Sequence, residues 1–264
     1  RDMLSMYKGT EKVTEMKNVD VGIFHYLQYQ CKEGSIFADK RVREAFSLAI
    51  DRDALVKHVL GAGSIPMGIF PKGSIGYDST VKPYEYNPEK AKQLLAEAGY
   101  KGQAFTIYTH TGIPMGKSLL TAIQDMLKQV GFNAKIEAVE VSALNNIRKE
   151  GTYDVFLASN NYVGGDAYAH INQRILSDNH HSHYKDDVMM KLIEDSNTTV
   201  DANARVELLK KLNLRMRETF APQIVTDQMQ ACYPINFGLK GLDLYEDGFI
   251  NVRNVDWDPS LVKK

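Results

Sequence analysis

The apolar positions between residues 105 and 159 predict alternating strands and helices. Residues 105–110 form a short apolar run, 132–141 alternate between apolar and polar, and 153–159 are nearly all apolar, so each is expected to be a strand. The segment between the first two carries apolar residues at helical spacing: Leu119, Leu120, Ile123, Met126, Leu127 and Val130. Strands joined by helices of these lengths indicate right-handed crossovers and a mostly parallel sheet.

Capping residues predict where other helices begin. Asp39 suits the N-cap of a helix over 40–50, and Asp51 that of a helix over 52–60. Asn87 and Pro88 suit the N-cap and first position of a helix that ends at Gly99. Ser142 is expected to cap the helix that precedes the third strand.

The remaining segments are assigned by composition and pattern. The β-branched and aromatic residues 21–31 predict a further strand. Three prolines and five glycines in residues 61–86 predict a long surface loop. We also expect helices near 166–176, 186–197 and 202–219, and a strand pair near 223–227 and 231–238.

Length and charge narrow the class of protein. The 264 residues can bury a substantial core in one large or two small domains. Lys and Arg number 32 and Asp and Glu 33, so no basic excess points to a nucleic-acid partner. No apolar run approaches the ~18 residues of a membrane span. Because the sequence opens at Arg1 within a polar stretch, we expect it to be a segment of a longer protein.

The two cysteines leave more than one interpretation open. Cys31 and Cys232 lie far apart and lack C-x-x-C spacing, which argues against a catalytic or metal-binding pair. They are expected to be buried thiols that act as small apolar groups, or to form one disulfide in an oxidising compartment.

The search for catalytic motifs predicts a chain that is not an enzyme. Residues 111–118 (TGIPMGKS) follow a strand and open a helix, but Thr111 stands where a phosphate-binding loop needs glycine and Pro114 removes a backbone donor. No G-x-S-x-G elbow is present. Glu137 and Glu140 alternate on a predicted strand, which indicates a solvated face.

The histidines cluster in one region. Four of the seven lie within fourteen residues: His170, His180, His181 and His183. Neutral imidazoles suit Ni, Cu and Zn, but no Cys or Glu completes a structural zinc set. A metal-related site and a polar surface loop rich in histidine are both consistent with this pattern.

Residues 153–172 (YDVFLASNNYVGGDAYAHIN) contain the strongest candidate binding segment. A buried strand there passes into a glycine-rich turn and then a helix. Ligands of open α/β sheets bind at the carboxyl ends of strands. The turn carries Asn160, Asn161, Tyr162 and Asp166, which are suited to hydrogen bonding and aromatic packing.

Two further segments resemble a known family. Residues 38–63 (ADKRVREAFSLAIDRDALVKHVLGAG) and 86–100 (YNPEKAKQLLAEAGY) resemble, in order, two motifs of the C-terminal lobe of extracellular solute-binding proteins of the peptide and nickel ABC-importer family, family 5. The resemblance covers about residues 20–240. It implies an α/β lobe of the periplasmic-binding-protein-II type, with a mostly parallel sheet flanked by helices.

The resemblance also implies an organisation and a function. Residues 1–264 are expected to be a single C-terminal lobe with its core in 20–240, and the tail 241–264 to return toward an N-terminal lobe that this sequence lacks. The protein would be the substrate-binding component of an ABC importer. It would be periplasmic or extracellular, and a lipid anchor to the membrane is one option. It would bind an oligopeptide, a dipeptide or a metal chelate and deliver it to a membrane permease. A ligand-sensing domain of a regulator with the same fold is the alternative.

The resemblance finally implies roles for individual residues. The family has a ligand-facing W-x-x-(D)-x-D-P-x-x-F stretch here, which puts Asn161 at the Trp, Gly164 at the peptide-binding Asp, and Asp166 at the second Asp. The nickel-binding branch of the family also lacks the first Asp, and a later His contacts its metal chelate. The spacing of that His from the Trp position, counted here from Asn161, leads to the residue before His180. Expected ligand contacts are therefore Asn160, Asn161, Tyr162, Gly164 and Asp166, with His180 and His181 for a metal chelate. No resident cofactor is expected; a Ni(II) chelate would be transported ligand.

Overall fold

A five-stranded sheet forms the centre of the molecule. The computed structural model describes residues 15–65, 68–70, 72, 74–113, 115–161, 167–171, 182–220, 223–236, 238–245 and 250–261. The strands are β1 (Glu15–Tyr29), β2 (Ala104–His110), β3 (Asn133–Val139), β4 (Val155–Asn161) and β5 (Gln223–Ile235). Their order is β3-β2-β4-β1-β5. β2 is parallel to β3 and β4, whereas β1 is antiparallel to β4 and β5. Four strands therefore share one direction, which confirms the mostly parallel sheet.

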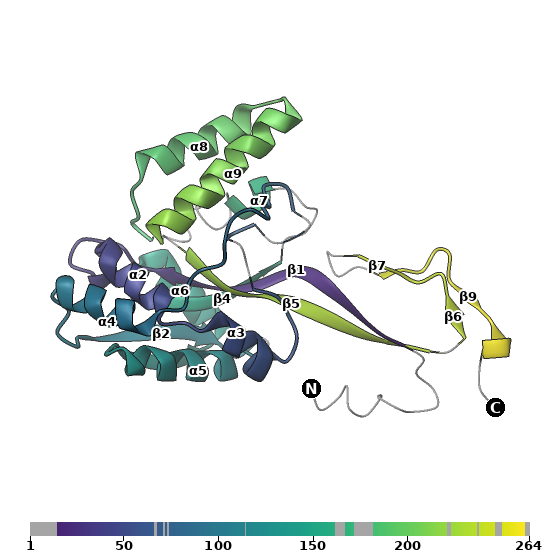
Figure 1. Cartoon of the computed structure of the whole chain (residues 1–264), viewed down its shortest axis with the longest axis horizontal. Coiled ribbons are helices and arrows are strands. Elements are labelled where there is room, and N and C mark those ends of the chain that lie inside the picture. The colour runs from purple at the N-terminus through teal and green to yellow at the C-terminus, as the bar shows by residue number, and fades with distance from the viewer. Residues whose placement is uncertain are drawn as a thin grey trace.

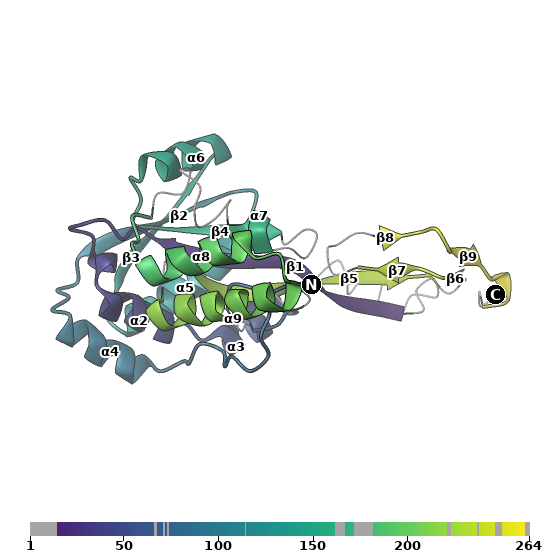
Figure 2. The same ribbon diagram turned by 90° about the horizontal axis from the view of Figure 1, so that it is seen from above.

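Helices cover both faces of this sheet (Figures 1 and 2). One face packs against α2 (Lys40–Leu48), α3 (Arg52–Ala54), the π-helix Leu55–Leu60, α4 (Pro88–Glu97) and α5 (Gly116–Gln129). The other packs against α6 (Val141–Glu150), α7 (Ala167–Ile171), α8 (Asp187–Thr198) and α9 (Ala202–Thr219). A short 3-10 turn, Ile36–Ala38, precedes α2. The result is a three-layered α/β lobe.

The core confirms the apolar pattern of the sequence. A single buried cluster contains Leu120, Ile123, Leu127, Val155 and Leu157, which join α5 to β4 as their spacing predicted. Aromatic rings extend this cluster beneath α2. Phe46 lies with its ring centroid 5.3 Å from that of Tyr29 and 5.5 Å from that of Phe132.

The capping predictions are mostly confirmed. The side chains of Asp39, Asp51 and Asn87 accept hydrogen bonds from backbone N–H groups in the first turns of their helices. The prediction that Ser142 is an N-cap was wrong. α6 starts at Val141, and its N-cap, Glu140, makes no side-chain capping bond.

Three segments differ from the sequence-based expectation. The helix expected over 52–60 is three residues of α-helix followed by a π-helix, in which Gly61 N–H donates to the carbonyl of Val56. The expected surface loop 61–86 is partly internal, since Ile69 and Phe70 are buried in the second core cluster. The expected strand pair near 223–238 is one continuous strand, β5.

The two longest strands continue beyond the lobe as a two-stranded ribbon. Residues 15–20 of β1 pair with residues 230–235 of β5, whereas the pairing of β1 with β4 starts only at Ile23. We call the paired segments 15–20 and 230–235 the ribbon. Figures 1 and 2 both show it reaching away from the helices toward the tail.

The tail consists of short paired strands. β6 (Leu239–Lys240) pairs with β9 (Asp256–Trp257), β7 (Asp243–Leu244) pairs with β8 (Ile250–Asn251), and the 3-10 turn Pro259–Leu261 follows. Its return toward a second lobe stays a prediction. Among the described helices, none combines the length and apolar character that a membrane span needs.

Candidate ligand-binding site

The carboxyl ends of β2 and β4 form the edge at which a ligand is expected. Because these strands are parallel neighbours, their ends point to the same side of the lobe. β4 ends at Asn160 and Asn161, whose backbones pair with Phe24 and Ile23 of β1. We call this side, with the segments that follow β2, β3 and β4, the binding edge. It adjoins the start of the ribbon.

The structure places only part of the predicted site. Asn160 and Asn161 are the last two residues of β4 and so lie at the binding edge, whereas the sequence placed them in the turn after the strand; their ligand role stays a prediction. Tyr162, Gly164, Asp166, His180 and His181 lie outside the described residues. The segment that resumes after the turn, α7, begins at Ala167 and is anchored in the core by buried Ala167 and Ile171.

The end of β2 adds polar groups that the sequence analysis missed. His110, the last residue of β2, accepts a hydrogen bond at Nδ1 from the N–H of Gly112 (3.1 Å). Burial lowers the pKa of this imidazole, and nearby Arg148 lowers it further. α5 then starts after Met115, which has a left-handed φ of 57° and makes no side-chain capping bond. The first-turn N–H groups of a helix are able to donate to a carbonyl or carboxylate oxygen.

Exposed apolar side chains also come from this edge. Met115, Val141 and Tyr168 are each about half exposed, and they follow the carboxyl ends of β2, β3 and β4 in turn. Large apolar side chains exposed at one edge suit contact with another apolar surface. No sequence motif marks these residues, and only the strand order brings them to one edge.

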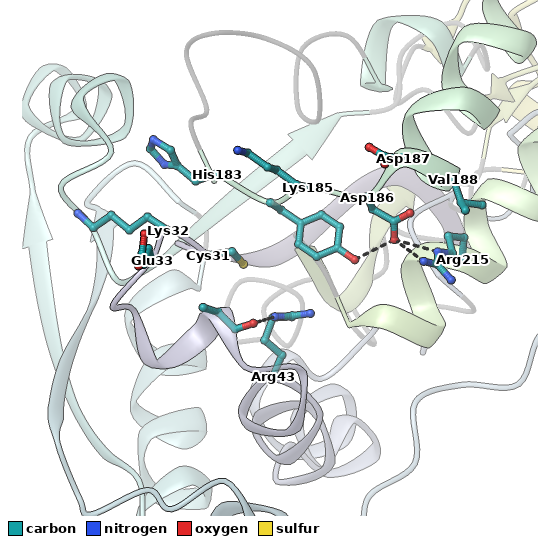
Figure 3. Close-up of a pocket in the computed structure, with 12 residues that line it drawn as sticks. Cys31, Lys32, Glu33, Arg43, His183, Lys185, Asp186, Asp187, Val188 and Arg215 are labelled. Carbon is teal, nitrogen blue, oxygen red and sulfur yellow. Dashed lines mark hydrogen bonds and ion pairs between the residues drawn. The ribbon is translucent and has the colours of Figure 1, made fainter.

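A cavity of about 740 Å³ lies at the opposite edge of the sheet. Tyr29, at the end of β1, pairs with Val155, the first residue of β4, so the residues after β1 lie far along the sheet from Asn161. Figure 3 shows the cavity between the segment after β1, the start of α2 and the residues that enter α8. Its charged lining residues are Lys32, Glu33, Arg43, Lys185, Asp186, Asp187 and Arg215.

The buried charges of this cavity interact with protein groups. Asp186 accepts from Arg215 (2.8 Å) and from the Tyr184 hydroxyl (Figure 3), and also from the N–H of Met189. Burial alone would raise the pKa of Asp186, but these hydrogen bonds outweigh it and hold the pKa below its usual range. The Nη atoms of Arg43 donate to backbone carbonyls, including that of Thr219. The cavity is therefore distinct from the binding edge and already uses its buried charges structurally.

The cysteines and His183 were the other candidates for a disulfide or a metal site. Both cysteines are free, so the disulfide alternative is wrong. Burial raises the pKa of Cys31 to about 11, which keeps it a thiol. His183 lies beside the opposite cavity, with Nδ1 2.9 Å from Oε1 of Gln30. In the part of the chain that the structure places, no three His, Cys, Asp or Glu side chains are arranged to hold a metal ion.

Comparison with known families gives the assignment. The family described as "Bacterial extracellular solute-binding proteins, family 5 Middle" matches residues 2–180, more than half of the chain. The chain belongs to this family. Family 5 proteins bind solutes, which agrees with the unsuccessful search for catalytic motifs.

Individual relatives support the same assignment. The chain is 32% identical over 156 residues to oligopeptide-binding protein AppA of Bacillus subtilis, covering 52% of the chain and 28% of that protein. It is 29% identical over 238 residues to the dipeptide-binding protein of Escherichia coli, covering 86% and 44%. The fold also matches NikA from Brucella suis in complex with Fe(III)-EDTA, with a TM-score of 0.85, 18% identity and coverage of 97% and 55%. This family 5 chain thus spans at most 55% of the length of any of these proteins.

Proposed function

We propose that this chain is one lobe of the substrate-binding component of an ABC importer. The ligand would lie between the binding edge and a second lobe supplied by the rest of the protein. The position of the binding edge carries the proposal, because it stands next to the ribbon through which the lobe leads to the tail. Hinged closure of two lobes would bury the ligand from both sides.

A peptide is the ligand we favour. The two curated relatives, at about 30% identity, are an oligopeptide-binding and a dipeptide-binding protein. Exposed Met115, Val141 and Tyr168 would give apolar contacts to peptide side chains, and the uncapped first turn of α5 would give N–H donors to peptide oxygens. In the family, the aspartate at the position of Gly164 binds the peptide. Here Asp166 would pair with the peptide's ammonium group instead.

A metal chelate is the second candidate. Its support is the glycine at position 164 and the spacing that leads to His180 and His181, together with the fold shared with an Fe(III)-EDTA complex. A neutral imidazole can complete the coordination of Ni(II) held by a small chelator. In either case the proposal includes no resident cofactor and no catalysis.

The proposal also includes a place and a partner. The extracellular character of the family supports a protein outside the cytoplasmic membrane, in the periplasm or at the cell surface. Lipid anchoring and delivery to a membrane permease belong to the proposal. A regulator with the same fold has no supporting relative among those described above.

Titrations of the full-length protein separate the two ligands. Asp166→Ala is expected to weaken dipeptide binding about 10- to 100-fold, because a hydrogen bond to a charged group contributes about 1.5–3 kcal/mol. The double substitution His180→Ala and His181→Ala is expected to leave dipeptide affinity within about twofold. Isothermal titration calorimetry with a mixture of dipeptides, and then with nickel plus free histidine, measures both.

His183→Ala is the matched control, since His183 lies at the opposite end of the sheet. It should change neither titration. If the wild-type protein and His183→Ala bind nickel–histidine and the double variant does not, the ligand is the metal chelate and not the peptide. A folded wild-type protein that binds neither probe would overturn the proposed function.

A further inference from the structure

Three polar side chains are buried where the ribbon joins the lobe. His25 of β1 and Thr226 and Asp227 of β5 are each 0% exposed. Nδ1 of His25 lies 2.9 Å from Oδ2 of Asp227, and the Thr226 hydroxyl lies 2.7 Å from Oδ1. We call these three residues the polar cluster. Buried polar groups cost stability unless they are hydrogen-bonded, so this set depends on its internal geometry.

The polar cluster lies between two irregularities in the pairing of β1 with β5. Asp20 pairs with Gln230 and Phe24 with Gln228, so β1 has two extra residues there. His25 pairs with Asp227 but Tyr26 pairs with Val225, so Thr226 is an extra residue in β5. Extra residues in one strand bend it and increase its twist. The direction of the ribbon is therefore set at this point.

The lobe holds β5 on both sides of the cluster. Gln228 exchanges two backbone hydrogen bonds with Ser64, each 2.9 Å long. A Cβ at Gly63 would lie 2.7 Å from the Gln228 carbonyl oxygen, so the loop passes close to the strand. On the other side, Nε of buried Arg52 donates to the carbonyl of Val225 (3.1 Å). β5 is thus fixed up to Gln228, and beyond it β5 continues paired with β1 as the ribbon.

The cluster selects one register. A slip of one residue would turn the side chains to opposite faces of the sheet. The Asp227 carboxylate would then lose its bond to His25 and keep only that from its neighbour Thr226, which is unfavourable for a buried carboxylate. The Thr226 hydroxyl, 3.2 Å from the His25 carbonyl oxygen, occupies the bulge itself. Packing of apolar side chains selects the register less strongly. Apolar side chains can repack after a slip, whereas a buried polar group that loses its partner cannot be compensated in this way.

We propose that His25, Thr226 and Asp227 are positioning residues that fix the angle at which the ribbon leaves the lobe. In a two-lobed receptor this angle would decide how the binding edge faces the second lobe, and this consequence rests on the proposed function. The angle itself is a property of the chain without ligand. Its measurement therefore tests the proposal independently of any peptide titration.

Spin labels on the lobe and on the tail measure the angle. Val200, between α8 and α9, is almost fully exposed, and Val252, after β8, is largely exposed, so both accept a label. Cys31 and Cys232 are first replaced by serine, and pulsed dipolar spectroscopy gives the distance distribution between the labels. Thr226→Val removes only the hydroxyl at nearly constant shape, and Asp227→Ala removes the carboxylate.

The cluster predicts a single distance population for the parent chain and a distribution at least twice as wide in Thr226→Val and Asp227→Ala. Asp227→Asn, whose amide can still bond both neighbours, is expected to restore most of the parent width. Thr219→Val, which removes a buried hydroxyl in α9, is the control and should leave the distribution unchanged. If Asp227→Ala does not fold, Thr226→Val decides. Folded cluster variants whose distributions superimpose on that of the parent would overturn the proposal.

Discussion

Replacing Phe46 with alanine is expected to lower the free energy of unfolding by about 3–5 kcal/mol. Phe46 is fully buried in α2, and its ring lies among those of Tyr29, Phe37, Phe105 and Phe132, with centroids 5.3 to 6.2 Å away. These rings come from β1, the turn before α2, β2 and the residue that precedes β3. Because a close-packed core relaxes only partly, alanine would leave a cavity between α2 and the sheet.

Urea unfolding followed by circular dichroism measures this loss. The control is Tyr86→Ala, since Tyr86 is about half exposed and belongs to neither core cluster, so the change is expected to stay within about 0.5 kcal/mol. A loss below about 1 kcal/mol for Phe46→Ala would show that α2 does not pack on the sheet as described.

The second large effect concerns binding by this chain alone. Its affinity for a dipeptide is expected to be about 1,000-fold lower than that of the full-length protein. A closed pocket buries 70–90% of a small ligand, whereas the binding edge alone supplies about half of the contacts. Halving a micromolar binding free energy of about −8 kcal/mol gives millimolar affinity.

Calorimetry of both proteins against the same dipeptides measures this ratio. The same titration of the chain with Met115→Ala is compared with that of the unchanged chain. This substitution truncates an exposed apolar side chain at the binding edge and removes nothing from the buried core. Equal affinity of the chain and the full-length protein would mean that the lobe contains a complete site and that the two-lobe account is wrong.

Much of the fold could be predicted because local signals agree with the tertiary structure. Asp39, Asp51 and Asn87 cap helices with their own side chains, which is a short-range effect that the sequence shows directly. The apolar spacing in residues 119–130 faces one buried cluster, and the continuous run at 155–158 alternates between that cluster and the one on the other face of the sheet. The parallel pairing then follows from the lengths of the connections.

The errors arise where tertiary contacts decide. The strand pair expected near 223–227 and 231–238 left residues 228–230 out of both strands, yet these residues continue β5 where it leaves the lobe for the ribbon. The π-helix 55–60 has backbone hydrogen bonds that span five residues in place of four, which the capping residues of this segment do not show. Ile69 and Phe70 are buried because α9 and the sheet leave room for them, although prolines and glycines flank them.

The binding edge was predicted in position but not in full composition. Asn160 and Asn161 were found from the rule that ligands bind at the carboxyl ends of parallel strands. The same rule applies to β2 and β3, but His110, Met115 and Val141 have no motif that marks them. Their juxtaposition with β4 depends on strand order, which the sequence does not specify.

Hydrogen exchange on the full-length protein tests the central claim most directly. With saturating dipeptide, we expect slower exchange in residues 110–113, 115–118, 158–161 and 167–171, at the binding edge. We expect no change in residues 31–38 and 183–188 around the opposite cavity. This result would place the ligand at the carboxyl ends of β2 and β4. Protection confined to the opposite cavity, with the binding edge unchanged, would contradict the account.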